Sequence, residues 1–283
     1  MVSLDEEEWI LSHAYIPEHI VSLMRLISKG EPFLIEDHLV IVKNKLIIFI
    51  GYPLDQSFSV ENCENILRRV IERFKAESIR FIGPEIPEFL LKASIERQSD
   101  KYYLLDLDQV KIKTSLLRLA QKMALEFSFE ITNSYTKEHQ ALNSELFKRD
   151  LLTTRVKDLY KSMPDYVSHS KTTYILNVRN KQGKLSAYYI LEVGAKKFNT
   201  YLLGVHSKRN YIPHASDFLF YKMIELTEKQ GKKKIHLGLG VNEGIRRFKE
   251  KWGGIPFLNY EYCECYLGRD KPLSLIKEIE GRL

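Results

Sequence analysis

One arrangement of residues occurs twice in this 283-residue sequence. Residues 64–83 read ENILRRVIERFKAESIRFIG, and residues 219–238 read LFYKMIELTEKQGKKKIHLG. Each copy has apolar residues at helical spacing, then a basic turn, a short strand that contains isoleucine, and a glycine that ends the strand. Repetition of a whole supersecondary unit predicts a duplicated domain.

A meander of short strands precedes each copy, and this order places the chain in the α/β (α+β) class. The strand-like runs lie at 32–35, 39–42 and 46–50 before the first copy, and at 172–178, 185–193 and 198–205 before the second. We expect mixed, mostly antiparallel sheets flanked by helices. The duplication predicts two tandem domains, 1–110 and 111–283, with the boundary near 107–115. No linker rich in Gly, Ser or Pro marks that boundary, so we expect the two domains to pack together.

Apolar periodicity predicts the remaining elements. Helices are expected at 16–27, 60–76, 216–230, 243–251 and 273–279, with another that starts at Thr114 and a long one over 137–161 that is broken near Pro164. Further strands are expected at 78–82, 102–107, 125–132, 234–239 and 257–266. Tight turns at Lys43-Asn44 and at Asn180–Gly183 join neighbouring strands as hairpins.

The positive charge of the chain is concentrated in one region. The formal net charge is +6. Residues 201–254 contain eleven Lys and Arg against five Asp and Glu, so this window carries the whole excess. A local basic concentration favours an anionic partner, such as a phosphate-bearing cofactor, a nucleic acid or a lipid headgroup. A solvated lysine-rich face without a partner is the alternative.

Composition and termini exclude several classes of protein. The chain is 44% hydrophobic and 28% charged, as expected for a globular protein. The N-terminus, MVSLDEEEWILSHAY, is acidic where a secretory signal is basic, and no apolar run approaches the ~18 residues of a membrane helix. We therefore expect a soluble, cytoplasmic protein. Cys63, Cys263 and Cys265 lack the partners of a zinc site, so reduced packing thiols and no metal are expected.

The order of elements resembles two GNAT acetyltransferase folds in tandem. The segments GYPL (51–54), YYLLDLDQ (102–109) and LLRLAQKMALEFSFEI (116–131) resemble the catalytic region of phosphatidylglycerol lysyltransferases. The stretch 206–254, which ends in GIRRFKEKWGG, is similar to the second domain of those enzymes and of the related FemAB peptidyltransferases. This resemblance implies a tandem GNAT fold, with the active site in the C-terminal domain.

Residues 237–254, LGLGVNEGIRRFKEKWGG, are rich in glycine, but the glycine spacing is not that of a phosphate-binding loop. Their pattern is G-x-G-x-x-x-G, which matches neither the dinucleotide fingerprint nor a P-loop. In a GNAT-type sheet, two parallel strands splay apart at this level. The glycines then let the strand end, and the next helix begin, close to the resulting cleft. The free N–H groups of that helix are expected to point into the opening.

The helix within this stretch carries the principal catalytic candidate. Ile245, Phe248 and Trp252 share one face and are expected in the core. Asn242 is expected to be the N-cap. The stem of Lys249 would be held beside Phe248 while its ammonium reaches an anion. By the resemblance, this lysine lines the donor or substrate site, where a cation could stabilise the oxyanion of an acyl transfer. A surface lysine on a short helix is the alternative.

Coenzyme A binding in a GNAT domain needs a glycine-rich turn whose N–H groups hold the pyrophosphate. The corresponding stretches, 206–218 and 55–62, contain no glycine, and Pro213 removes a further N–H. FemAB-like and lysyltransferase-like enzymes show the same absence because their donor is an aminoacyl-tRNA. The basic window 201–254 suits that donor, since phosphates attract Lys and Arg without reading sequence.

Further residues are assigned to the site, and for the histidines a purely structural role is also considered. His206 ends a predicted strand and is the second catalytic candidate, as a general base for an amine; a packed structural histidine is the alternative. His236 is expected to be a packing residue. The residues assigned to substrate binding are Tyr201, Asn242, Glu243, Arg246 and Arg247.

The function expected from these features is transfer of an acyl group, with aminoacyl-tRNA as donor, to an amine or a hydroxyl. The acceptor would be a small molecule, a peptide or a lipid headgroup, and no cofactor is required. Two other classes remain open: an acyl-CoA-dependent N-acetyltransferase, and a non-catalytic descendant that binds RNA or protein through its basic face.

Overall fold

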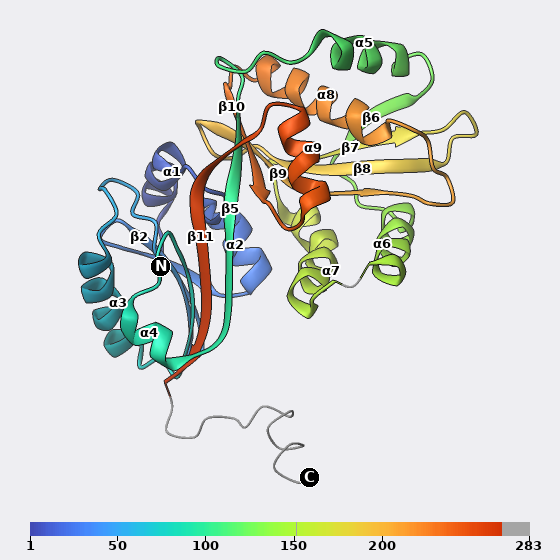
Figure 1. The fold of residues 1–283 in the computed structure, drawn as a ribbon. Helices are drawn as coiled ribbons and strands as arrows, with labels where there is room; N and C mark the ends of the chain where they lie inside the picture. Colours follow the sequence, from blue (N-terminus) through green and yellow to red (C-terminus); the bar gives the residue numbers. More distant parts are fainter. Residues whose placement is uncertain (151, 268–283) are drawn as a thin grey trace. The chain divides into compact units, whose positions relative to one another are not determined.

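The computed structural model describes residues 1–150 and 152–267, and the helix expected at 273–279 lies outside them. The chain forms two compact units (Figure 1). Among the described residues, unit 1 consists of Met1, Gly30–Ser99 and residues 259–267. Unit 2 consists of Val2–Lys29 and Asp100–Leu258. These units are defined by contacts within the chain. The division into duplicated domains 1–110 and 111–283 stays a prediction.

Unit 1 contains the first meander, one long helix and a parallel strand. Strand β1 pairs antiparallel with β2, and β2 pairs antiparallel with β3. Strand β4 pairs parallel with β3. The helix α3 buries Cys63, Ile66, Leu67 and Val70 on one face, and the hydroxyl of Ser59 caps its N-terminus. The elements are β1 (Glu31–Ile35), β2 (His38–Lys43), β3 (Leu46–Ile50), α3 (Val60–Phe74), β4 (Ser78–Gly83) and α4 (Glu88–Ala93).

Unit 2 contains the second meander and most of the helices. Strands β6, β7, β8 and β9 pair antiparallel, and β10 pairs parallel to β9. Helices α5 and α8 lie on one face of these strands, and α6 and α7 on the other (Figure 1). The elements are α1 (Leu4–His13), the 3-10 helix η1 (Pro17–His19), α2 (Val21–Ser28), α5 (Thr114–Met123), β6 (Ser128–Thr132), α6 (Lys137–Arg149), α7 (Thr154–His169), β7 (Thr173–Arg179), β8 (Leu185–Glu192), β9 (Phe198–His206), α8 (Ala215–Lys229), β10 (Lys234–Leu239) and α9 (Glu243–Lys251).

The two copies of the repeat exchange their last strands. Strand β5 (Ser94–Asp106) follows the first copy in the chain, but it pairs antiparallel with β10 of the second. Strand β11 (Ile255–Tyr266) follows the second copy, but it pairs antiparallel with β4 of the first. Each copy is therefore completed by a strand that the chain supplies after the other copy.

Two predicted helices differ in the structure. The segment 16–27 is divided into η1 and α2, and α1 precedes them unpredicted. The helix expected over 137–161 is two helices, α6 and α7, and the break falls before Thr154. Pro164 lies inside α7 rather than ending it. A proline is tolerated inside a helix when packing holds the flanking turns, and the neighbouring Met163 and Tyr166 are buried in the core.

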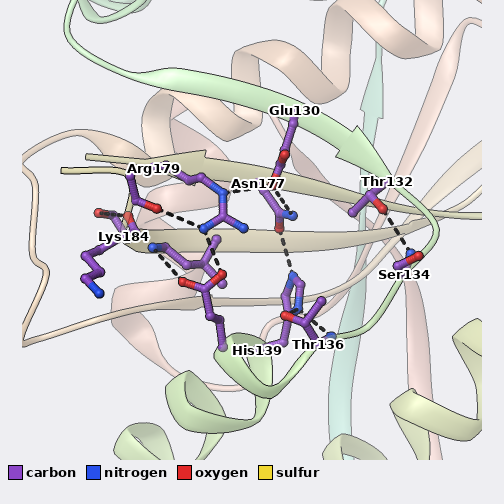
Figure 2. A network of polar contacts seen from close by, with 12 residues as sticks. Glu130, Thr132, Ser134, Thr136, His139, Asn177, Arg179 and Lys184 are labelled. Carbon is purple, nitrogen blue, oxygen red and sulfur yellow. Dashed lines mark hydrogen bonds and ion pairs between the residues drawn. The ribbon is translucent and has the colours of Figure 1, made fainter. Parts of the chain in front are cut away.

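A polar network fixes α6 to the strands β6 and β7 (Figure 2). The backbone N–H of Thr136 donates to Nδ1 of His139 at 2.9 Å, so the neutral ring carries its proton on Nε2 and donates to Asn177 Oδ1, also at 2.9 Å. The Asn177 amide in turn donates to Glu130 on β6, 3.2 Å away. Burial lowers the pKa of His139, which keeps the ring neutral. Arg179 adds ion pairs to the carboxylates of Glu130 and Glu138.

Candidate active site

The parallel strands of unit 2 part after a short paired stretch. Lys234–His236 of β10 pair with Phe198–Thr200 of β9, whereas β9 runs on to His206 and β10 to Leu239. We call the point after Thr200 and His236 the β9/β10 fork. The equivalent strands β3 and β4 of unit 1 stay paired over five positions. Among the described residues, the splay expected of a GNAT-type sheet is therefore present in unit 2.

The end of β10 and the turn that follows it have an unusual backbone. Gly238 has φ +71°, and Val241, which carries a β-branched side chain, has φ +59°. Asp100 on β5 holds this turn, since its carboxylate accepts the backbone N–H of Val241 at 2.7 Å. A Cβ at Gly240 would lie 2.7 Å from the other carboxylate oxygen, so the close approach of Asp100 requires glycine there.

Helix α9 begins as the sequence predicts. Asn242 is the N-cap, and its side-chain oxygen accepts the N–H of Ile245 at 3.0 Å. Trp252 is buried and stacks on Phe220, and Phe248 packs edge-on against the same ring. Ile245, however, is 37% exposed, so the expectation that it belongs to the core is wrong.

Lys249 is buried, with 4% of its surface exposed. Its Nζ donates to the carbonyl oxygen of Leu239 at the end of β10 and lies 5.5 Å from the centre of the Tyr103 ring. Burial disfavours the charged form and lowers the pKa of Lys249 to about 7, although the Asp100 carboxylate acts in the opposite direction. Lys249 is therefore not a surface lysine, and both its amine and its ammonium are populated near neutral pH.

The remaining predicted residues of α9 lie on its exposed side. Glu243, Arg246 and Arg247 are exposed, and Arg247 forms an ion pair with Glu243 one turn away. The helix therefore presents two guanidinium groups outward and one lysine inward. Whether the outer residues bind a substrate stays a prediction.

The two predicted residues on β9 are held by other side chains. His206 ends the strand, and its Nε2 lies 3.3 Å from Nη1 of Arg149, so this nitrogen accepts from the guanidinium. Burial and the Arg149 charge lower the pKa of His206. The Tyr201 ring lies 4.8 Å from that of Tyr189, and burial raises its pKa well above the usual value. The catalytic role of His206 stays a prediction.

A buried carboxylate occupies the first turn of α8. Asp217 accepts from Lys251 Nζ at 2.6 Å and from Trp252 Nε1 at 3.0 Å, and its other oxygen lies 3.2 Å from Nδ1 of His214. This is the end of the helix where coenzyme A phosphates bind in a conventional GNAT domain. In this protein the Asp217 carboxylate lies there, paired with the Lys251 ammonium.

Sequence reasoning missed Asp100 and Tyr103 as parts of this site. Both lie on β5, more than a hundred residues before α9 in the chain, and they reach Val241 and Lys249 through the pairing of β5 with β10. No local pattern indicates this pairing, because β5 is a strand exchanged between the copies.

Solved structures similar to this one cover 83 to 99% of the chain. L-PGS from Bacillus licheniformis matches 99% of this chain and 96% of its own at 14% identity, with a TM-score of 0.57. FemX matches 93% of this chain and 96% of its own at 13% identity, with a TM-score of 0.60. A tandem GNAT protein from the clavulanic acid biosynthesis pathway matches 83% of this chain and 79% of its own at 11% identity, with a TM-score of 0.52. The chain has the tandem GNAT fold.

The tandem GNAT fold predicted from the sequence is thus confirmed, and at these identities the likeness concerns the fold alone. No protein-family model matches the sequence. No curated protein matches it either. Across residues 1–150 and 152–267, no group of three or more His, Cys, Asp or Glu side chains is placed to hold a metal ion. In the same residues, no helix is both long enough and apolar enough to cross a membrane.

Proposed function

We propose that this tandem GNAT protein is an aminoacyltransferase that moves the aminoacyl group of an aminoacyl-tRNA to an amine or a hydroxyl. The observation that carries the proposal is Lys249, buried beside the β9/β10 fork with a pKa of about 7. A lysine tuned in this way suits proton transfer at neutral pH. The likeness of the fold to L-PGS and FemX supports acyl transfer as the class of reaction.

In the proposed reaction, the acceptor nitrogen or oxygen attacks the ester carbonyl carbon of the donor. The neutral amine of Lys249 takes the proton that the acceptor loses. The ammonium so formed stabilises the negative oxygen of the tetrahedral intermediate and then gives the proton to the departing ribose oxygen. One bond to the acceptor forms, one carbon–oxygen bond to the tRNA breaks, and Lys249 returns to its starting state.

Two features favour an aminoacyl-tRNA over acyl-CoA as donor. The stretch 206–218 has no glycine to form a diphosphate-binding turn, and the Asp217 carboxylate already occupies the first turn of α8. The excess of basic residues over 201–254 suits a donor with many phosphates. A cytoplasmic location is part of this proposal, because aminoacyl-tRNA is a cytoplasmic metabolite.

The test uses a universal acceptor, because the natural one is unidentified. Total tRNA charged with labelled amino acids is mixed with the protein and hydroxylamine, and hydroxamate formation is measured above the uncatalysed rate. We expect transfer by the wild type and a loss of about 100-fold or more in Lys249→Met. Lys122→Met, on the exposed surface of α5, is the matched control. Transfer from acyl-CoA instead of tRNA would refute the donor, and transfer from neither would refute the reaction.

A further inference from the structure

Two buried polar atoms at the β9/β10 fork lack hydrogen-bond partners among the described residues. They are Oγ1 of Thr200 and Nε2 of His236. The two residues are 1% and 0% exposed, and they are register partners at the last paired position of the two strands. An unpaired buried polar atom destabilises a fold, so two at one place call for a physical explanation.

Both side chains lie on the same face of the sheet. Asn199 precedes Thr200 and reaches the opposite face, where its amide donates to Thr227 of α8 at 3.0 Å. Because successive residues of a strand alternate between faces, Thr200 faces away from α8. Phe198 therefore shares the face of Thr200, and its ring lies 5.8 Å from that of His236. Thr200 and His236 are thus neighbours on the face away from α8.

The unpaired nitrogen of His236 is a hydrogen-bond donor. The backbone N–H of Gly238 donates to Nδ1 of the ring at 3.1 Å, so Nδ1 carries no proton. Burial and nearby positive charge, including that of Lys249, lower the pKa of His236 well below its usual value and keep the ring neutral. The single proton of the neutral ring is then on Nε2. The Thr200 hydroxyl can donate as well, since its proton rotates freely.

Aromatic rings flank the imidazole that carries this N–H group. The rings of Tyr102 and Phe257 lie 4.9 and 5.5 Å from the His236 ring, both close to perpendicular. A donor that is buried between aromatic rings interacts more strongly with a negative oxygen than it would in water. It also needs no rearrangement when that oxygen develops charge.

We propose that Thr200 and His236 form a two-donor site for an oxygen atom of the acyl group. This inference rests on the proposed function, since it places the acyl group at the β9/β10 fork. The hydrogen bonds from these two neutral side chains add to the charge stabilisation and proton transfer that Lys249 supplies. The oxygen is either the carbonyl oxygen under attack or an oxygen in the donor side chain, and both accept two hydrogen bonds.

Thr200→Val is the principal test, because valine keeps the shape of threonine and removes the hydroxyl. The Thr200 hydroxyl has no hydrogen-bond partner among residues 1–150 and 152–267, so the free energy of unfolding should stay unchanged or rise. The rate of transfer from aminoacyl-tRNA should fall about tenfold or more. His236→Phe, which keeps an aromatic ring among aromatic neighbours, should also lower the rate.

Thr227→Val is the matched control on the opposite face. This hydroxyl is also buried, but it donates to Met223 and accepts from Asn199. We expect Thr227→Val to lose stability and to keep its kcat. The opposite responses of the two threonine variants separate binding of a substrate oxygen from a structural role.

The kinetic constants identify the oxygen. An equal fall in kcat for every amino acid donor assigns the carbonyl oxygen. A rise in KM confined to donors with oxygen in their side chains assigns a side-chain oxygen. Wild-type rates in both Thr200→Val and His236→Phe would overturn the inference, leave the proposed function standing, and indicate that an ordered water occupies the site. If the wild type transfers nothing, the proposed function fails and this inference fails with it.

Discussion

The carboxylate of Asp100 accepts a hydrogen bond from the backbone N–H of Val241 at 2.7 Å. This bond joins β5 to the turn that starts α9, and it holds Val241 in the left-handed region at φ +59°. Valine rarely occupies that region, because its branched side chain crowds the backbone. Strain of this kind persists where the surrounding structure imposes it.

Val241→Gly should therefore stabilise the protein. The valine side chain is 61% exposed, so little packing is lost, and glycine adopts a positive φ without strain. We expect the free energy of unfolding to rise by ~1 kcal/mol in urea titrations. Asp100→Ala should lower it by ~1–2 kcal/mol, and Asp100→Asn, which keeps an acceptor oxygen, should lower it less. A destabilised Val241→Gly variant would contradict the assignment of strain.

Lys249→Met should raise stability while it removes activity. A buried amine that must give up its charge is a cost, and methionine fills similar space without that cost. We expect a gain of ~1–3 kcal/mol at pH 7 by urea titration. Lys122→Met, at an exposed position, should change neither quantity. Lower stability together with lost activity would make Lys249 a structural residue.

The stability of the wild type should rise with pH between about 7 and 10.5. The unfolded chain keeps the Lys249 proton up to the usual pKa of 10.5, whereas the folded protein releases it at about 7. Within this window the unfolded state binds more protons, so the free energy of unfolding increases with pH. Denaturant titrations over this range give the slope of the unfolding free energy against pH. This slope should be smaller in Lys249→Met than in the wild type, and an equal slope would contradict the lowered pKa of Lys249.

The transfer rate should increase with pH, reach half its maximum near pH 7, and level off above that. The proposed mechanism starts from the neutral amine of Lys249, and its pKa is about 7. The profile is measured with hydroxylamine and divided by the uncatalysed rate at each pH, which removes the ionisation of the acceptor. A rate that falls as pH rises through 7 would mean that the ammonium is the starting form.

Acid should weaken the network around His139. The folded pKa of His139 is lowered by burial, so its stabilising effect is complete above the unfolded value of 6.5 and is lost as pH falls toward the folded value. His139→Gln should cost ~1–2 kcal/mol at pH 7, because the bond to Asn177 is weakened. The variant should also lose less stability than the wild type between pH 7 and 5. A parallel loss in both proteins would exclude His139 as the acid-sensitive group.

Binding of tRNA should depend on the outer face of α9. Arg246 and Arg247 are exposed, and each phosphate contact that a substitution removes should lower the slope of log K against log salt by about one. The double variant Arg246→Gln/Arg247→Gln is compared with Arg118→Gln/Lys122→Gln on α5. Filter binding at several salt concentrations gives both slopes. Equal slopes in the two double variants would place the tRNA elsewhere.

Local patterns predict the elements around the site well. The strand 234–239 and the helix 243–251 have the predicted bounds, and Asn242 is the N-cap. Glycine spacing, apolar periodicity and capping all act within one or two turns of chain, so they can be read from neighbouring residues. For the same reason the repeated unit of helix, basic turn and strand is visible in the amino-acid sequence alone.

The surroundings of Lys249 are not predictable in this way. Its burial depends on Tyr103 and Leu239, which meet because β5 pairs with β10 across a long separation in sequence. The orphaned atoms of Thr200 and His236 likewise depend on where two strands stop pairing. Periodicity indicates that a residue is buried, as it does for His236, but it does not indicate which atoms remain unsatisfied.

The exchange of β5 and β11 has a consequence for synthesis on the ribosome. When β4 emerges, the strand that will cover its free edge, β11, has not been translated, because the second copy is still to come. Until then the backbone N–H and C=O groups on that edge of β4 stay unpaired. An unpaired strand edge is a site where chains aggregate. The order of translation therefore leaves the edge of β4 unpaired until β11, the last strand among the described residues, has been made.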